Sequence, residues 1–295
     1  MRSLILASGL KVEPMREFLR HLRYVMSENP VTGVALILFV IIVAIGIFGP
    51  VIAPYDPLAS NTANALKPPS WNHLFGTDNL GRDVFSRVLV ATRLDLLISV
   101  AAVALSFAVG SVLGSLSGYY GGWLDRIVGR SIDTIMAFPL FVLAMGIVAA
   151  LGNTVENIVY ATAIINLPFY TRFARAEVNI RRGAGYVAAA RLAGNSDLRL
   201  LALQIYPNIL PPMMVQISLN MGWAILNAAG LSFIGLGVRP PTPEWGIMVA
   251  EGANFIVSGE WWLAFFPGLS LMLAVLTFNL LGDGLRDIVD PAQRT

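Results

Sequence analysis

The sequence has no cysteine and few ionisable residues. Its 295 residues include 20 Lys and Arg, 18 Asp and Glu, and two histidines, His21 and His73. The absence of cysteine excludes disulfide scaffolds and thiolate metal sites, and two histidines are too few for a His-rich metal cluster, so we predict no metal site. Charged residues make up 13% of the chain, about half the usual share. With 56% hydrophobic residues, this predicts an all-α membrane protein with several spans.

Charge-free stretches locate the spans. Six occur, over residues 29–55, 96–124, 134–155, 157–171, 200–238 and 261–282. Five are long enough to cross a bilayer, and the short fourth is flanked by Glu156, Arg172 and Arg175, which can snorkel to the interfaces. The fifth has room for two tight crossings, but its prolines and asparagines favour one helix with irregular ends. We therefore predict six transmembrane helices.

The distribution of basic residues gives the orientation. With the N-terminus inside, 15 of the 20 Lys and Arg residues lie in the inner segments. The positive-inside rule then predicts that both termini are cytoplasmic. The predicted organisation is a cytoplasmic segment 1–30, a first span 31–54, an outer loop 55–94, a membrane core 95–285 and a cytoplasmic tail 286–295. Within the core we expect spans at about 96–118, 128–150, 156–176, 204–235 and 261–283, an inner loop 177–203 and an outer loop 236–259.

The N-terminal segment has its own pattern. Apolar residues recur there at helical spacing, with arginines elsewhere on the helix; they are Met15, Phe18, Leu19, Leu22 and Met26. This predicts an amphipathic helix that lies on the membrane surface or, as the alternative, packs on the rest of the protein.

Missing residue types also exclude mechanisms. The spans are nearly empty of ionisable groups, Asp133 being close to an inner end, so a proton relay has no carriers. A phosphate-binding loop needs Lys directly after Gly, but Lys11 and Lys67 both follow Leu. Neither histidine lies in a span, so Ser106 and Ser232 have no His partner there, and no H-E-x-x-H motif occurs. The chain is therefore not predicted to be an enzyme, and ATP-driven work would need a partner.

The inner loop is the candidate contact for such a partner. Residues 188–193 favour helix, Gly194 is a natural C-terminal stop, and Ser196 or Asp197 can cap a following helix. A short helix with small side chains suits close approach to a partner's groove. An ordinary structural turn is the alternative interpretation.

At this loop the sequence resembles the permease subunits of ATP-binding-cassette importers. Their motif, E-A-A-x-x-x-G followed by I-x-L-P, is matched by Ala189, Ala190, Gly194 and Pro207, while Ala188, Gln204 and Tyr206 replace the Glu, Ile and Leu. Three further stretches resemble the second permease subunit of dipeptide, oligopeptide and nickel importers. They are residues 76–87, 240–246 and 279–287. The resemblance covers residues 30 to 291.

The resemblance implies a type I importer permease fold in a bacterial inner membrane. It also implies a heterodimer with a homologous permease, two ATPase subunits that hold ATP and Mg²⁺, and an extracytoplasmic substrate-binding protein; it implies no cofactor in this chain and no nucleic acid. Transport would proceed by alternating access as ATP binding pulls the coupling helix. The coupling helix and its exit would comprise Tyr186, Val187, Ala188, Ala189, Ala190, Arg191, Leu192, Ala193, Gly194, Asn195, Ser196 and Asp197.

Two outer motifs have their own interpretation. Asp78 and Asp83 flank Gly81 ahead of an apolar face, which predicts a turn leading into an amphipathic outer helix; a calcium loop, the alternative, lacks its downstream Glu. The proline-rich run 240–243 predicts a stiff, extended loop. Its predicted role is contact with a substrate-delivering protein through Pro241, Pro243, Glu244 and Trp245, or anchoring at the membrane interface with Trp261 and Trp262.

Polar residues in the fifth span are candidates for the translocation path. Asn208, Gln216, Asn220 and Asn227 either line this path or form interhelical hydrogen bonds. The alternative function is a carrier or channel that works alone, and the sequence does not distinguish dipeptides, longer peptides, peptide-like compounds and nickel chelates as substrates.

Overall fold

The computed structural model describes residues 30–289, which form helices without any strand. The elements are α2 (Pro30–Ile52), η1 (Thr62–Asn64), α3 (Val84–Tyr120), α4 (Gly122–Met136), α5 (Leu140–Leu151), α6 (Val155–Arg181), α7 (Gly185–Leu192), α8 (Asp197–Arg199), the π-helical η2 (Leu200–Ile205), α9 (Tyr206–Phe233), α10 (Trp245–Ala253) and α11 (Trp262–Val289). The predicted amphipathic N-terminal helix and residues 290–295 lie outside the described range.

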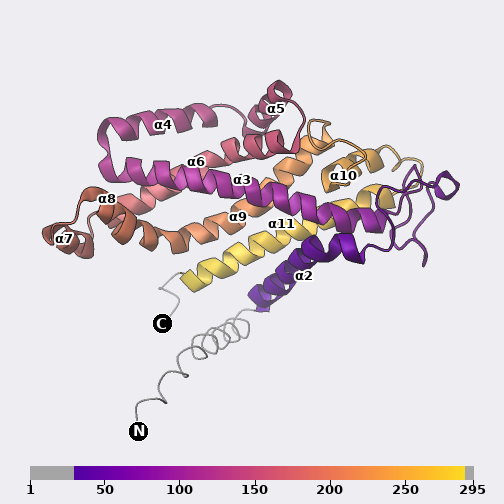
Figure 1. The fold of residues 1–295 in the computed structure, drawn as a ribbon, viewed down its shortest axis with the longest axis horizontal. Helices are drawn as coiled ribbons and strands as arrows, with labels where there is room; N and C mark the ends of the chain where they lie inside the picture. Colours follow the sequence, from indigo (N-terminus) through magenta and orange to yellow (C-terminus); the bar gives the residue numbers. More distant parts are fainter. Residues whose placement is uncertain (1–29, 290–295) are drawn as a thin grey trace, which may run out of the picture.

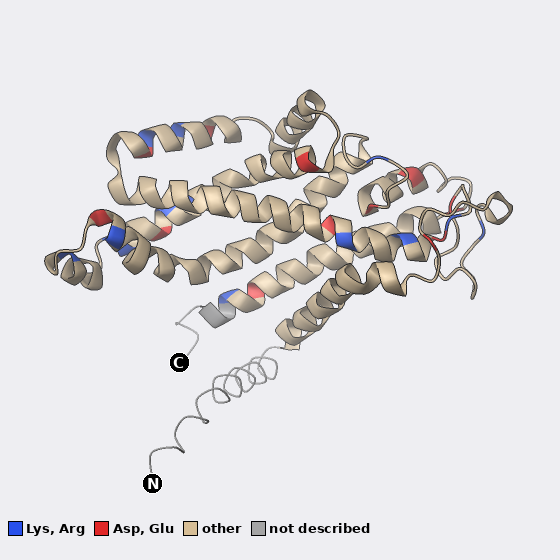
Figure 2. Cartoon of the chain, viewed as in Figure 1, with Lys and Arg blue, Asp and Glu red and all other residues tan. Residues whose placement is uncertain are grey.

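The long helices run lengthwise beside one another (Figure 1). We call the two ends of this bundle the α7 end and the α10 end; the loop of residues 53–83 lies at the α10 end. The first turn of α2 and the last turn of α11 both point toward the α7 end (Figure 1). Acidic and basic residues gather toward the two ends and on α4, and leave the middle of α2, α9 and α11 uncharged (Figure 2).

Four helices of the described range are long and apolar enough to cross a membrane: α2, α3, the continuous helix from α8 to α9, and α11. The pair α4 and α5 passes the same test as a unit. α6 has 27 residues, but it carries Glu177 and several arginines in its second half, and does not pass. Composition within the described residues thus supports four or five spans, where six are predicted.

The predicted third span, 128–150, is not one continuous helix. The chain breaks between Met136 and Leu140, and α4 and α5 meet at an angle of 88°. Pro139 explains the break, because it has no N–H to donate and it disfavours helical backbone at Phe138.

α3 begins earlier than predicted. Asp83 caps it by accepting a hydrogen bond from the Ser86 backbone N–H at 2.8 Å, and the helix continues for 37 residues without interruption. The helix predicted after the turn is therefore present, but it is the first part of α3 and continues without a break into the predicted second span.

α9 is a single helix despite its prolines. Pro207, Pro211 and Pro212 lie in its first two turns, where their missing N–H groups loosen the helical ladder, and the π-helical η2 immediately precedes them. The stretch from residue 197 to 233 is one continuous path of 37 residues. α8, η2 and α9 thus join the loop that holds α7 to the bundle without a break.

Glycines bring α3 and α6 into close contact. Gly110, Gly114 and Gly118 lie four residues apart on one face of α3. A Cβ atom at Gly114 would lie 2.2 Å from the carbonyl oxygen of Thr171, and one at Gly118 would lie 2.8 Å from that of Arg175. Small residues at this spacing let two membrane helices touch through their backbones, and this contact positions α6 and the loop that follows it.

Candidate functional site

The predicted short helix is present as α7, at the extremity of the α7 end (Figure 1). It is terminated as predicted: Gly194 has φ +82°, and its N–H donates to the Arg191 carbonyl at 3.0 Å. Asn195 donates from its backbone N–H and from its side chain to the Ala190 carbonyl. These bonds satisfy carbonyls that the helix end leaves free. Ser196 precedes α8 but forms no side-chain cap, so that detail of the prediction is wrong.

One side of α7 packs against the rest of the protein, and the other side is exposed. Val187 is buried against η2 residues that include Leu200. By contrast, Ala188 and Ala189 are exposed, and Leu192 is 90% exposed. A leucine so exposed at the tip of a helix has no partner within residues 30–289.

A polar cluster ties this loop to the end of α3. The Tyr119 hydroxyl donates to the Asp197 carboxylate at 2.6 Å and accepts from Arg191 at 3.0 Å. This hydrogen bond to Tyr119 raises the pKa of Arg191. Arg182 also donates to the Gly118 carbonyl at 3.0 Å. Sequence reasoning missed Tyr119, because its partners are more than 70 residues away in the chain.

The four polar residues of α9 are not equivalent. Gln216 and Asn208 line a hollow of about 650 Å³ between α6, α9 and α11, together with Glu177, Arg181 and Arg286. Asn220 and Asn227 are buried, and Asn227 donates to the Trp223 carbonyl of its own helix at 2.8 Å. The interhelical bond at this level comes instead from Ser218, which donates to the Phe278 carbonyl at 2.9 Å.

The loop after α9 differs from its prediction. It contains α10 and is not extended throughout, and Glu244 caps α10 by accepting from the backbone N–H groups of Gly246 and Ile247 at 2.8 Å. Trp245 is 2% exposed and donates to the Val88 carbonyl at 3.2 Å. Pro243 and Glu244 are also buried, which leaves Pro241 as the exposed member of the four predicted contacts. Within this chain the side chains of Pro243, Glu244 and Trp245 are therefore buried, and their contact with a substrate-delivering protein stays a prediction.

Two buried carboxyl groups meet at the α10 end. Asp95 of α3 accepts a hydrogen bond from the backbone N–H of Trp245 at 3.2 Å. The Glu244 carboxyl group lies beside Asp95. Burial raises the pKa of Glu244. Asp95 lies inside α3, one residue before the predicted span at about 96–118, and is 2% exposed.

The turn at 78–83 is organised by its own side chains. Asp78 accepts from the Leu80 and Arg82 backbone N–H groups at 2.9 Å and from the Arg82 side chain at 2.6 Å. Gly81 has φ +74°, as a tight turn requires. Asp83 is bonded to His73 and to Ser86. Both carboxylates therefore have protein partners, and the motif acts as a structural turn.

An all-helical bundle with several helices long and apolar enough to cross a bilayer defines a multi-pass membrane protein. The family of binding-protein-dependent transport system inner membrane components matches residues 110–295, and the N-terminal transmembrane domain of oligopeptide transport permease C matches residues 14–69. The chain belongs to this family of inner-membrane permeases.

Curated relatives agree along nearly the whole chain. A probable D,D-dipeptide transport system permease protein of Escherichia coli K12 is 43% identical and covers 91% of this chain and 90% of its own length. The di/tripeptide transport system permease protein of Pseudomonas aeruginosa is 42% identical, covering 94% and 92%. The glutathione transport system permease protein of Escherichia coli O6 is 40% identical, covering 94% and 90%. The chain is thus a multi-pass protein of a bacterial inner membrane.

Proposed function

We propose that this chain is one permease subunit of an ATP-driven importer for dipeptides, oligopeptides or related compounds. The single observation that carries the proposal is its similarity, over more than nine-tenths of its length, to permeases named for short peptides. It pairs with a homologous permease, and each subunit supplies half of the path. Two ATPase subunits hold ATP and Mg²⁺, and a binding protein delivers the substrate from outside.

The proposed topology has six spans with both ends cytoplasmic. The six crossings are, in chain order, α2, α3, the bent pair formed by α4 and α5, α6, α9 and α11. The first turn of α2 and the last turn of α11 point toward the same end, which supports an even number of crossings (Figure 1). α6 crosses as the fourth span because its apolar face packs on α3, while Arg172 and Arg175 on its charged face pair with Asp133 and Asp125 of α4. In this arrangement the α7 end is cytoplasmic.

The exposed face of α7 is the proposed contact with an ATPase subunit. This face has small side chains at Ala188 and Ala189 and an exposed Leu192. Such a face can insert into a groove of the ATPase subunit. The chain then continues through α8 and η2 into α9 as one helical path. Movement of α7 with the ATPase subunit therefore moves α9, and the path opens alternately to the two sides.

Gln216 is the proposed pathway residue of this subunit. It lines the hollow together with Glu177, Arg181 and Arg286, and in the proposed dimer the second permease would close this hollow. Asn220 and Asn227 belong to the helix interior. A peptide carries amide and charged terminal groups, which such mixed polar side chains can contact while it moves.

Reconstitution tests the proposal against a carrier that works alone. Proteoliposomes with all four kinds of subunit should take up a labelled dipeptide only when ATP is present on the ATPase side. Proteoliposomes with this chain alone should not. Uptake by the chain alone, driven by an ion gradient, would instead establish the carrier.

A further inference from the structure

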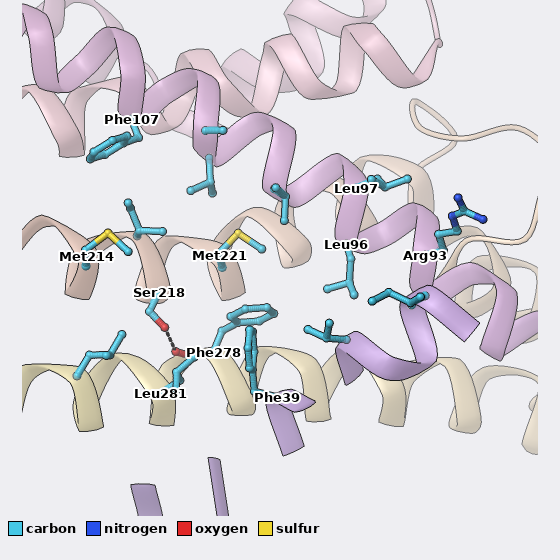
Figure 3. A pocket seen from close by; sticks show the side chains of 18 residues that line it. Phe39, Arg93, Leu96, Leu97, Phe107, Met214, Ser218, Met221, Phe278 and Leu281 are labelled. Carbon is cyan, nitrogen blue, oxygen red and sulfur yellow. Dashed lines mark hydrogen bonds between the residues drawn. The ribbon is translucent and has the colours of Figure 1, made fainter. Parts of the chain in front are cut away.

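A second cavity is independent of the polar hollow. It has a volume of about 740 Å³ and lies between α2, α3, α9 and α11. Its lining is almost wholly apolar, and Figure 3 shows Phe107 and Met214 toward one end and Arg93 at the other. Several of its side chains are open to the surroundings of the bundle; Leu97, for example, is 57% exposed. We call it the apolar groove.

Arg93 is the single charged side chain that lines this groove. It is exposed and has no hydrogen bond or ion pair within the described residues 30–289. The nearest carboxylate in sequence, Asp95, is two residues on, about 200° around the helix, and it is buried against Trp245. An ionisable residue in a membrane helix without a protein partner indicates a ligand of opposite charge.

The position of Arg93 matches the edge of the hydrocarbon layer. It packs beside Gly46, where a Cβ atom would lie 4.0 Å from the Arg93 Cα. Gly46 lies six residues before the end of α2, which is about 9 Å along the axis. A long arginine side chain at this depth places its guanidinium at the level of lipid headgroups. The adjoining groove runs inward from there.

The volume of the groove favours a flexible hydrocarbon chain over a whole transmembrane helix as its occupant. A helix about 10 Å in diameter would fill 740 Å³ with only about 9 Å of its length, roughly six residues. A flexible hydrocarbon chain fits a narrow apolar space without this restriction. We propose that the groove binds one phospholipid of the leaflet at the α10 end, with its acyl chain between α2, α3, α9 and α11 and its anionic headgroup on Arg93.

Lipid retention in the assembled complex tests this site. The complex is reconstituted with phosphatidylglycerol in phosphatidylcholine, washed in detergent and examined by native mass spectrometry. The wild type should retain one phosphatidylglycerol at this chain, and Arg93→Gln should lower its occupancy at least tenfold. Arg130→Gln is the matched control, because Arg130 is an exposed arginine on α4 outside the groove. Equal retention in Arg93→Gln, or an equal loss in Arg130→Gln, would overturn the proposal.

A groove-filling variant separates the acyl chain from the headgroup. Ala104 lines the groove and is exposed, so Ala104→Phe occupies the space while Arg93 remains. It should also lower retention, and a phosphatidylglycerol with a photoreactive acyl chain should label the wild-type peptide that contains residues 97–107. Labelling elsewhere in the chain, or a cross-link from position 104 to the partner permease, would show that a lipid does not fill the groove.

Discussion

Gly194 shows how one residue controls the shape of the proposed coupling loop. Its positive φ ends α7, and a Cβ atom built there meets nothing within 4 Å. A substitution therefore acts through the backbone alone. A β-branched residue in this conformation costs about 1–2 kcal/mol, whereas asparagine tolerates it.

We predict that Gly194→Val leaves the complex assembled but lowers peptide-stimulated ATP hydrolysis several-fold, while Gly194→Asn stays close to the wild type. ATPase assays with and without peptide on the reconstituted complex measure this. Normal stimulation in Gly194→Val would mean that the end of α7 does not matter for coupling.

Ala189 tests the exposed face itself. Ala189→Asp places an unpaired charge on a surface that we expect to be desolvated against the ATPase subunit, at a cost of several kcal/mol. Stimulated ATP hydrolysis should fall at least tenfold. Ala59→Asp is the matched control, because Ala59 is exposed in the loop at the α10 end. If both variants behave alike, this face of α7 is not an interface.

Tyr119 and Tyr120 form a natural pair of variant and control. Tyr119→Phe removes the bonds to Asp197 and Arg191 but keeps the ring, whereas the Tyr120 side chain is half exposed. We expect Tyr119→Phe to lower the free energy of local opening of the loop by about 1 kcal/mol. Amide exchange over 185–199 should become roughly fivefold faster, and Tyr120→Phe should leave it unchanged. Unchanged exchange in Tyr119→Phe would show that the loop is held by α7 packing alone.

At the scale of elements, the sequence predicted features that depend on neighbouring residues, and it did not predict features that depend on contacts between distant helices. α7 and its glycine stop were predictable, because helix propensity and a C-terminal glycine are local properties. The bend between α4 and α5 was also signalled locally, by Pro139, but the charge-free stretch around it outweighed that signal. The burial of Trp245 and Glu244 was not predictable, since it depends on α3, about 150 residues away.

The contact between α3 and α6 was signalled in the sequence. Gly110, Gly114 and Gly118 form a repeated small-residue spacing that explains why α6, although it carries charge, stays in the bundle. Gly114→Leu should destabilise the protein by about 1–3 kcal/mol through overpacking and lower its thermal midpoint in detergent. Gly129→Leu should not, because its Cβ position is open. Equal midpoints for both variants would contradict the glycine contact.

At the scale of the whole molecule, the distribution of basic residues predicts the orientation in the membrane, which single cysteines can test. Asn79, exposed at the α10 end, and Leu192, exposed at the α7 end, are suitable positions for single cysteines because the chain has none of its own. Cys at position 79 should react with a membrane-impermeant thiol reagent in intact cells. Cys at position 192 should react only after permeabilisation. The reverse pattern would invert the proposed topology.

The central claim is that α7 docks on the ATPase subunit. The most direct measurement is photo-cross-linking from single positions in the assembled complex. Leu192 and Trp71 are both at least 90% exposed, at opposite ends of the bundle. A photoreactive residue at 192 should cross-link to the ATPase subunit and one at 71 should not. Failure of position 192 to reach the ATPase subunit, in a complex that hydrolyses ATP in response to peptide, would contradict the account.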